Sequence, residues 1–221
     1  MSLLSQTLDS PDPMVRRLTV EAMADHATSE AVELLRSALG DHHPKVRAGA
    51  RRSLRALAET EAAGARVRSG LIADAAAIAR AIVDDPASRW REAEQVATLG
   101  YELSGSLDGV DRRALAVALA EGFFESARAE VGTAAWHALR ALDVDEVKGG
   151  AVDRLASLLE RFRRLAASAE QGDRADADLA AWGALSRRAE AAVFAIGAWR
   201  DERAVGTLRA MVKKDSAADE R

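Results

Sequence analysis

The chain has 221 residues, of which 48% are hydrophobic and none is cysteine, and its 31 basic and 35 acidic residues give a formal net charge of -4. This composition allows a continuous core, and it excludes disulfides, thiol catalysis and cysteine-type zinc sites. The acidic balance provides no global field for nucleic acid or an anionic membrane, and no run resembles a signal peptide or a membrane span, so we expect a cytoplasmic protein.

Apolar residues recur at helical spacing along most of the chain. The first predicted helix covers residues 12–25, where Pro13 suits a first helical turn and Asp12 or Ser10 can cap the free amides. A second stripe follows over residues 31–39, after a short polar turn. The later stripes predict a helix from Pro44 and helices over residues 71–83, 87–103, 112–124, 127–142, 147–169, 174–198 and 202–213.

A repeat is visible in the first two of these units. The stretch DPMVR at residues 12–16 returns 31 residues later as HPKVR at residues 43–47, and Met23 then aligns with Leu54. One helical hairpin cannot bury its apolar face alone, whereas stacked copies bury a continuous core. The spacing therefore predicts a stack of antiparallel helix pairs.

These units resemble the HEAT-like repeats of the bilin-lyase type, which read approximately D-P-x-V-R-x-x-A-x-x-A-L, a turn, and V-x-x-L-x-x-A-L. Residues 12–39 match nearly a full unit, residues 44–57 match half of the next, and residues 189–208 match a helix-turn-helix, whereas residues 60–130 depart from the pattern. The resemblance implies an all-α, right-handed α-solenoid of about five antiparallel helix pairs, with one row of helices lining a concave groove. We expect a single domain over residues 1–214 and a disordered tail over residues 215–221.

The Val-Arg of each unit places Arg16 and Arg47 at equivalent positions. Two such arginines could form a ladder that reads carboxylates or phosphates, because a guanidinium can fork onto either group. The favoured alternative is structural: each arginine bonds turn carbonyls or a neighbouring carboxylate such as Asp12 or Asp41.

A basic patch is the main candidate for a binding surface. On the helix over residues 147–169, three arginines and Ser157 share one polar face, and two further arginines begin the counterpart helix that precedes it. The alternative is a solvated face with internal ion pairs to Asp153 and Glu160. The arginines of the predicted patch are Arg112, Arg113, Arg154, Arg161 and Arg164.

Tryptophans are the largest side chains in an alanine-rich chain, at positions 90, 136, 182 and 199. If Trp136 and Trp182 faced the groove, they would be hot spots for a bound peptide, although such residues more often fill gaps between helix layers. Phe123 and Phe124 are adjacent, and neighbouring positions of an α-helix point 100° apart, so we expect them to be buried unequally.

The sequence carries no recognisable catalytic or metal-binding motif. His42 and His43 are adjacent in a turn, where their side chains point apart, and there is no phosphate loop or nucleophile elbow. We therefore expect no cofactor and interpret the chain as a scaffold or adaptor that binds another protein through a peptide or helix in its groove. The alternative is a HEAT-like enzyme, either a bilin lyase or an alkylpurine DNA glycosylase; the acidic balance argues against the latter.

Overall fold

A computed structural model describes residues 3–170, together with residues 193, 197 and 206. Residues 3–170 form nine α-helices and two short 3-10 helices, without a strand. The elements are α1 (Leu3–Leu8), α2 (Pro13–Ala22), η1 (Met23–Asp25), α3 (Ser29–Ala38), α4 (Pro44–Ala58), α5 (Gly64–Asp84), α6 (Trp90–Leu103), α7 (Gly109–Gly122), η2 (Phe123–Glu125), α8 (Ala129–Leu142) and α9 (Asp145–Glu170).

The chain divides into two compact units, Met1–Leu142 and Asp143–Arg221. Of the second, the structure describes mainly α9. The helices predicted over residues 174–198 and 202–213, and the predicted tail at residues 215–221, lie outside the described residues. The single domain over residues 1–214 stays a prediction.

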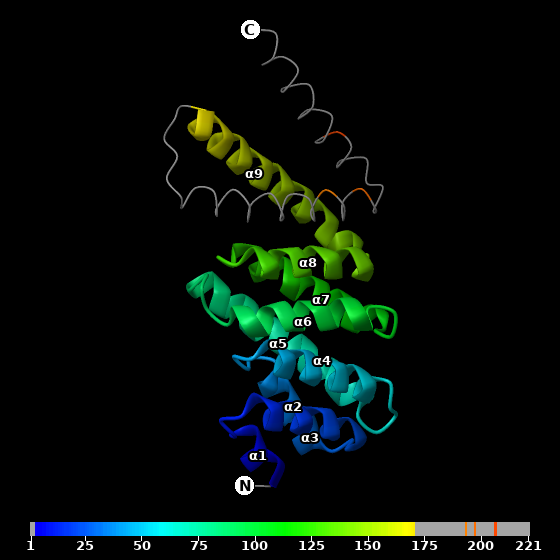
Figure 1. Ribbon diagram of the computed structural model, residues 1–221. Coiled ribbons are helices and arrows are strands. Elements are labelled where there is room, and N and C mark those ends of the chain that lie inside the picture. Colours follow the sequence, from blue (N-terminus) through cyan, green and yellow to red (C-terminus); the bar gives the residue numbers. More distant parts are fainter. Residues whose placement is uncertain (1–2, 171–192, 194–196, 198–205, 207–221) are drawn as a thin grey trace. The chain divides into compact units, whose positions relative to one another are not determined.

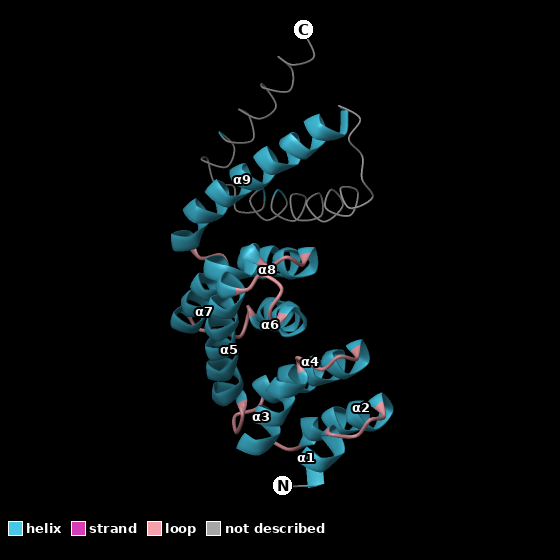
Figure 2. Cartoon of the chain, turned by 90° about the vertical axis from the view of Figure 1, so that its left-hand side faces the viewer, coloured by secondary structure: helices cyan, strands magenta, loops and turns pink. Residues whose placement is uncertain are grey.

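In the first unit the helices form two rows. Helices α2, α4, α6 and α8 pack on one another in succession, and α3, α5 and α7 form the second row (Figures 1 and 2). Each connection between the rows is short, so consecutive helices are antiparallel. This arrangement confirms the stacked helix pairs, including over residues 60–130, whose sequence departs from the repeat pattern described above. The handedness and the groove stay predictions.

Local sequence signals set the helix ends. The Asp12 carboxylate accepts a hydrogen bond from the Met14 backbone N–H at 2.8 Å, and Pro13 occupies the first turn of α2 as predicted. Helix α5 begins at Gly64, about two turns before the predicted start at residue 71, and the buried Val67 continues its apolar face in this added segment.

Small residues let neighbouring helices approach closely. Gly49 on α4 faces α2, where an added Cβ would lie 2.9 Å from Val20 Cγ2. At the end of α7, a Cβ on Gly122 would collide with the backbone of Ala79 on α5. Backbone atoms cannot rotate away as a side chain can, so this second contact is the stricter constraint.

Phe123 and Phe124 are both buried, at 0% and 8% exposure, so the expectation of unequal burial is wrong. The reason is that the α-helix ends at Gly122 and the two rings follow in η2. The 100° spacing of an α-helix therefore does not apply to them.

Arginine–carboxylate pairs connect successive helices in both rows. The second row has the tightest example, in which Arg36 Nη2 lies 2.6 Å from Asp74 Oδ1 and Arg36 Nε donates to the other oxygen at 2.8 Å. A forked bond of this kind fixes the rotation of one helix against the next. The other pairs are Arg52–Glu21 (α4 to α2), Arg51–Glu102 (α4 to α6) and Arg68–Asp111 (α5 to α7).

Arg16 and Arg47 anchor the turns that precede their own helices. Arg16 Nη1 donates to the carbonyl oxygens of Ser10 and Pro11 at 2.7 and 3.2 Å. Arg47 Nη1 makes the equivalent bonds to the carbonyl oxygens of Asp41 and His42, at 2.9 and 3.2 Å. The structural interpretation of these arginines is therefore confirmed.

Arg16 also reaches the next repeat. Its guanidinium forks onto the Asp41 carboxylate, with Nε to Oδ2 at 2.8 Å and Nη2 to Oδ1 at 3.1 Å, and both side chains are largely buried. Burial by itself would raise the pKa of Asp41. Hydrogen bonds from Arg16 and from the His43 backbone N–H, with the charges of Arg16 and His42, nevertheless lower this pKa overall.

We predict that Gly122→Ala lowers the free energy of unfolding by about 1–3 kcal/mol, because the new methyl group forces α7 away from α5. Urea unfolding followed by circular dichroism measures this loss. Gly109→Ala is the matched control, since nothing lies within 4 Å of the added Cβ, and it should be neutral or slightly stabilising. Equal stabilities of the two variants would contradict the close approach.

We predict that Asp41→Asn lowers the free energy of unfolding by about 3 kcal/mol at about pH 7, because it leaves the Arg16 guanidinium buried without its counter-charge. The pKa of Asp41 is lower in the folded state. Its contribution is thus complete above the unfolded pKa of about 3.9 and is lost as the pH falls through the lower folded-state pKa.

The difference in free energy of unfolding between wild type and Asp41→Asn should therefore be constant from about pH 7 to about pH 5 and should become smaller at lower pH. Unfolding curves recorded across this range test the prediction. Glu30→Gln removes an exposed carboxylate without an ion pair among the described residues and serves as the control. If this difference stays the same down to about pH 2, the ionised Asp41 carboxylate does not stabilise the fold as proposed.

Candidate binding site

The arginines predicted as a patch have different surroundings. Arg112 Nη2 donates to the carbonyl oxygens of Ser104 and Leu107 at 3.2 and 3.3 Å, so Arg112 anchors the turn before α7 as Arg16 does before α2. Arg113, its neighbour on α7, is exposed. Arg112 is thus committed to a structural role, while Arg113 lies at the surface.

The other three arginines of the predicted patch lie on α9, in the second unit. Arg154 is half-buried and interacts within the protein, whereas Arg161 and Arg164 are exposed. Arg164 Nε lies 3.6 Å from Glu160 Oε1, which is one of the internal ion pairs that the sequence allowed. Each half of the predicted patch is described in its own unit, and the combined patch stays a prediction.

Trp136 belongs to the core of the first unit. It has 0% exposure, and its ring centroid lies 4.4 Å from that of Phe124. A ligand on the surface cannot contact a side chain in this position, so we correct its inclusion among the binding residues. Trp182, the second predicted hot spot, lies outside the described residues.

A different tryptophan lies at the surface among arginines. Trp90, the first residue of α6, is half-buried. Three guanidinium carbons lie close to the centroid of its ring: Arg91 at 4.6 Å, Arg128 at 4.8 Å and Arg47 at 6.0 Å. We call these four residues the Trp90 cluster.

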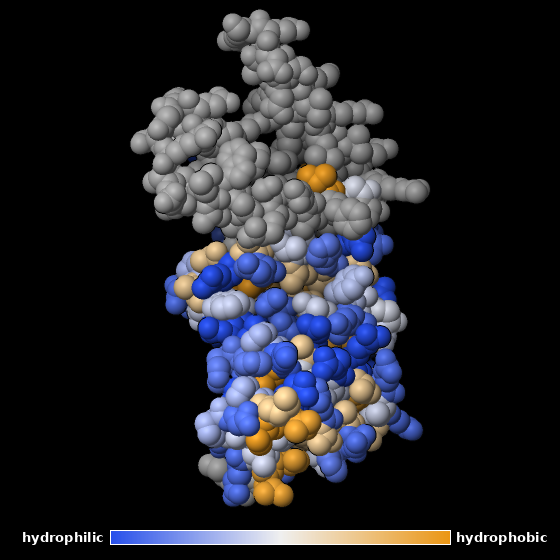
Figure 3. Space-filling view, viewed as in Figure 1, coloured by the Kyte–Doolittle hydropathy of each residue, from blue (hydrophilic) through white to orange (hydrophobic). Residues whose placement is uncertain are grey.

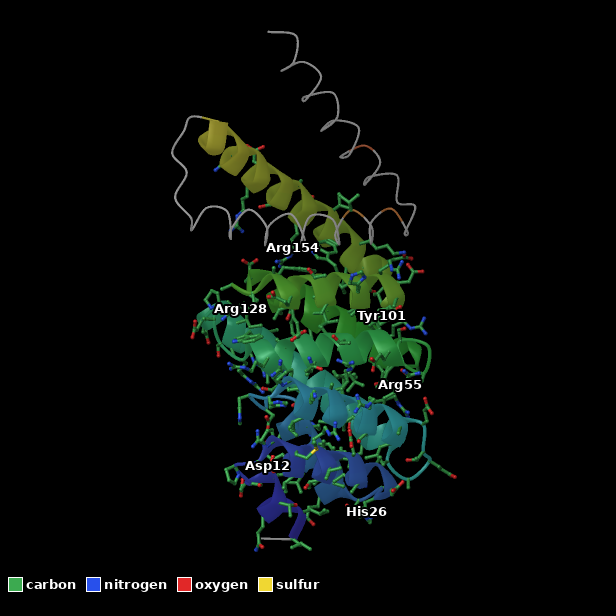
Figure 4. All side chains as sticks on the ribbon, viewed as in Figure 1. Asp12, His26, Arg55, Tyr101, Arg128 and Arg154 are labelled. Atoms are coloured by element: carbon green, nitrogen blue, oxygen red, sulfur yellow. The ribbon has the colours of Figure 1, made fainter. Side chains whose placement is uncertain are left out.

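The Trp90 cluster draws on three successive helices of one row. Arg47 lies in the first turn of α4, Trp90 and Arg91 begin α6, and Arg128 directly precedes Ala129, the first residue of α8. Figure 4 shows Arg128 on the same side of the row as Asp12, where these helices begin, whereas Arg55 and Tyr101 mark the opposite side. The positive ends of the helix dipoles therefore face this edge.

Turn geometry brings the last arginine to the ring. The backbone N–H of Ala127 donates to the carbonyl oxygen of Pro86 at 2.8 Å, which ties the turn before α8 to the turn before α6. Arg89 adopts a left-handed conformation with φ 45 and donates to both oxygens of Glu92, at 2.9 and 2.6 Å. The Glu92 carboxylate, in the first turn of α6, is thereby paired with an arginine outside the cluster.

The cluster concentrates positive charge without an ion-paired carboxylate among the described residues. Arg47, Arg91 and Arg128 have no carboxylate partner there, and Arg47 Nε is buried without a hydrogen-bond acceptor. A cation–π contact contributes about 0.5–1 kcal/mol at an exposed site, while like charges at this spacing repel each other. Such a group of guanidiniums suits an anion, which would relieve the repulsion.

Comparison with the first repeat shows how the cluster arises. Arg16 and Arg47 occupy equivalent positions and bond equivalent turn carbonyls. Arg16 then meets the Asp41 carboxylate in the next repeat, whereas Arg47 meets the ring of Trp90 in the next repeat. The exchange of a carboxylate for an aromatic ring leaves the second arginine without a counter-charge.

The sequence pattern alone does not identify this cluster. In the sequence Trp90 is one of four tryptophans, and the order Arg89-Trp90-Arg91 already places a cation before and after the ring. That local signal was available. The approach of Arg128 from the next repeat was not, because it depends on the turn that Ala127 and Pro86 close.

No group of three His, Asp or Glu side chains within the described residues could hold a metal ion, and none of the helices described there is long and apolar enough to cross a membrane. Exposed apolar side chains gather on α1 and α2, whereas the rest of the described surface in this view is largely hydrophilic (Figure 3). They are Leu3, Met14, Val15 and Leu18.

The comparisons with known proteins agree with this architecture. A family model for HEAT repeats matches residues 1–97, which contain α1 to α5 and the first part of α6. No curated protein and no solved structure matches the chain significantly. The match does not distinguish the bilin-lyase type from other HEAT repeats. Together with the two rows of helices in the first unit, the match over residues 1–97 supports a HEAT-like repeat protein.

Proposed function

We propose that this chain is a protein-interaction scaffold or adaptor that holds a peptide or helix of a partner protein along the row formed by α2, α4, α6 and α8. HEAT repeats commonly serve as interaction scaffolds. The observation that supports the proposal most directly is the Trp90 cluster, because tryptophan and arginine are the residues that most often dominate binding energy at protein interfaces.

The position of the cluster suits this role. Arg91 and Arg128 are exposed, and Trp90 is half-buried, so a ligand can reach the ring and the two charges together. The cluster lies on packed helix ends, which fix the backbone of its residues and the Arg47 side chain before a partner arrives and so reduce the entropy lost on binding. The apolar side chains on α2 offer a second contact for the same partner at the other end of the row.

We predict that Trp90→Ala abolishes or weakens at least tenfold the capture of a specific partner by the tagged full-length chain from its native cells. Recovery is measured by quantitative mass spectrometry, and the strongest candidate is then purified and titrated against wild type and variant. Trp90→Phe, which keeps an aromatic face, should retain more binding than Trp90→Ala.

The matched control for charge is Arg66→Gln/Arg80→Gln. Both arginines are exposed on α5, in the other row, and have no ion pair among the described residues. This variant should capture the partner as wild type does. If Trp90→Ala folds normally and captures the same proteins in the same amounts, the role assigned to the cluster is wrong.

The predicted patch on α9 is tested separately. If it contributes to partner binding, Arg154→Glu/Arg161→Glu/Arg164→Glu should reduce capture of the same partner at least tenfold, because buried or close charge pairs across an interface become repulsive. Arg66→Glu/Arg80→Glu, on α5 in the other row, would report a general effect of charge. Unchanged capture by the triple variant would remove α9 from the binding surface.

A further inference from the structure

We propose that the Trp90 cluster is a recognition site for a phosphorylated side chain of the partner. This inference rests on the proposed function, since it supplies the chemistry of the group that the scaffold binds.

The charge of the cluster favours a phosphorylated ligand. Three guanidiniums converge on one ring with no carboxylate partner among the described residues, and the nearby Glu92 is held by Arg89. A phosphorylated side chain carries about 1.5–2 negative charges at neutral pH, against one for a carboxylate. The dianion therefore matches the uncompensated charge of the cluster better than a single Asp or Glu does.

The arrangement of hydrogen-bond donors in the cluster also suits a phosphate group. Arginine presents planar, forked donors that suit the several oxygens of a phosphate, and all three cations of the cluster are arginines. Arg47 is 8% exposed and already holds the carbonyl oxygens of its turn, so its position is fixed. Arg91 and Arg128 are exposed and can close on a ligand from the surface.

The helix ends and the indole ring around these charges favour the same kind of ligand. Helices α6 and α8 both begin at this edge, so the partial positive charges of their first turns add to those of the side chains. The indole of Trp90 provides an apolar surface beside the charges, against which the carbon chain of a phosphorylated residue can pack. Charge, forked donors and an aromatic surface together define the site.

The experiment titrates the full-length chain with four probes: inorganic phosphate and the capped peptides Gly-phosphoSer-Gly, Gly-Asp-Glu-Gly and Gly-Ser-Gly. The indole N–H signal of Trp90 in a nitrogen-15 correlation spectrum, assigned with Trp90→Phe, reports binding even when the affinity is weak. We expect a saturable shift with the phosphopeptide and an affinity at least tenfold above that of either unphosphorylated peptide.

Arg91→Gln/Arg128→Gln should weaken binding of the phosphopeptide at least tenfold while leaving circular dichroism and thermal stability unchanged. Arg66→Gln/Arg80→Gln, with the same loss of charge on the other row, should bind as wild type does. Added salt should weaken binding, because the cluster is at the surface. Equal losses in the two double variants would overturn the proposal.

The remaining outcomes separate this inference from the proposed function. Absence of a saturable shift with phosphopeptide and phosphate, or equal binding of the Asp-Glu peptide, would overturn phosphate recognition and leave a scaffold that binds by other contacts. Binding of inorganic phosphate alone, without the phosphopeptide, would overturn recognition of a phosphorylated polypeptide and would remove the support that the cluster gives to the scaffold.

Discussion

The arginine at the start of a repeat is the interaction on which the architecture depends. Arg16 bonds the carbonyls of its own turn and the Asp41 carboxylate of the next repeat, so a single side chain fixes both the turn and the spacing between units. A helical hairpin cannot bury its apolar face alone, and stacking requires that each unit meet its neighbour in a defined register. Buried arginine bonds and close glycine contacts such as Gly122 against Ala79 supply that register in the first unit.

The Trp90 cluster is a modification of this structural device. Arg47 keeps the turn bonds of Arg16, but its outer side faces the ring of Trp90 in place of a carboxylate. Two neighbouring arginines then reach the same ring, from α6 and from the turn before α8. The proposed binding surface is thus formed by the same contacts that hold the repeats together, with one counter-charge removed. Function in a repeat protein can arise in this way without any change in the fold.

The sequence predicted the architecture better than the site, for physical reasons. Helical periodicity and the repeated Pro-x-Val-Arg are local signals, and they located most helices to within a few residues, even where the repeat motif fades. The approach of Arg128 to Trp90 depends on a hydrogen bond between two distant turns, and the burial of Trp136 depends on which face of α8 meets Phe124. Neither is encoded in spacing along the chain. The left-handed turn at Arg89, which fixes where α6 begins, likewise gave no sequence signal.

The cluster spans three successive helices of one row, α4, α6 and the turn that leads into α8. In a solenoid each unit contacts only its neighbours, so small rotations between units accumulate along the row. A group of side chains that contacts three units would resist such rotations and stiffen this segment of the row. Conversely, bending of this segment would separate Arg47 from Arg128 and so change the affinity of the cluster for a bound ligand. The curvature of the repeats and ligand binding at the Trp90 cluster are therefore mechanically linked.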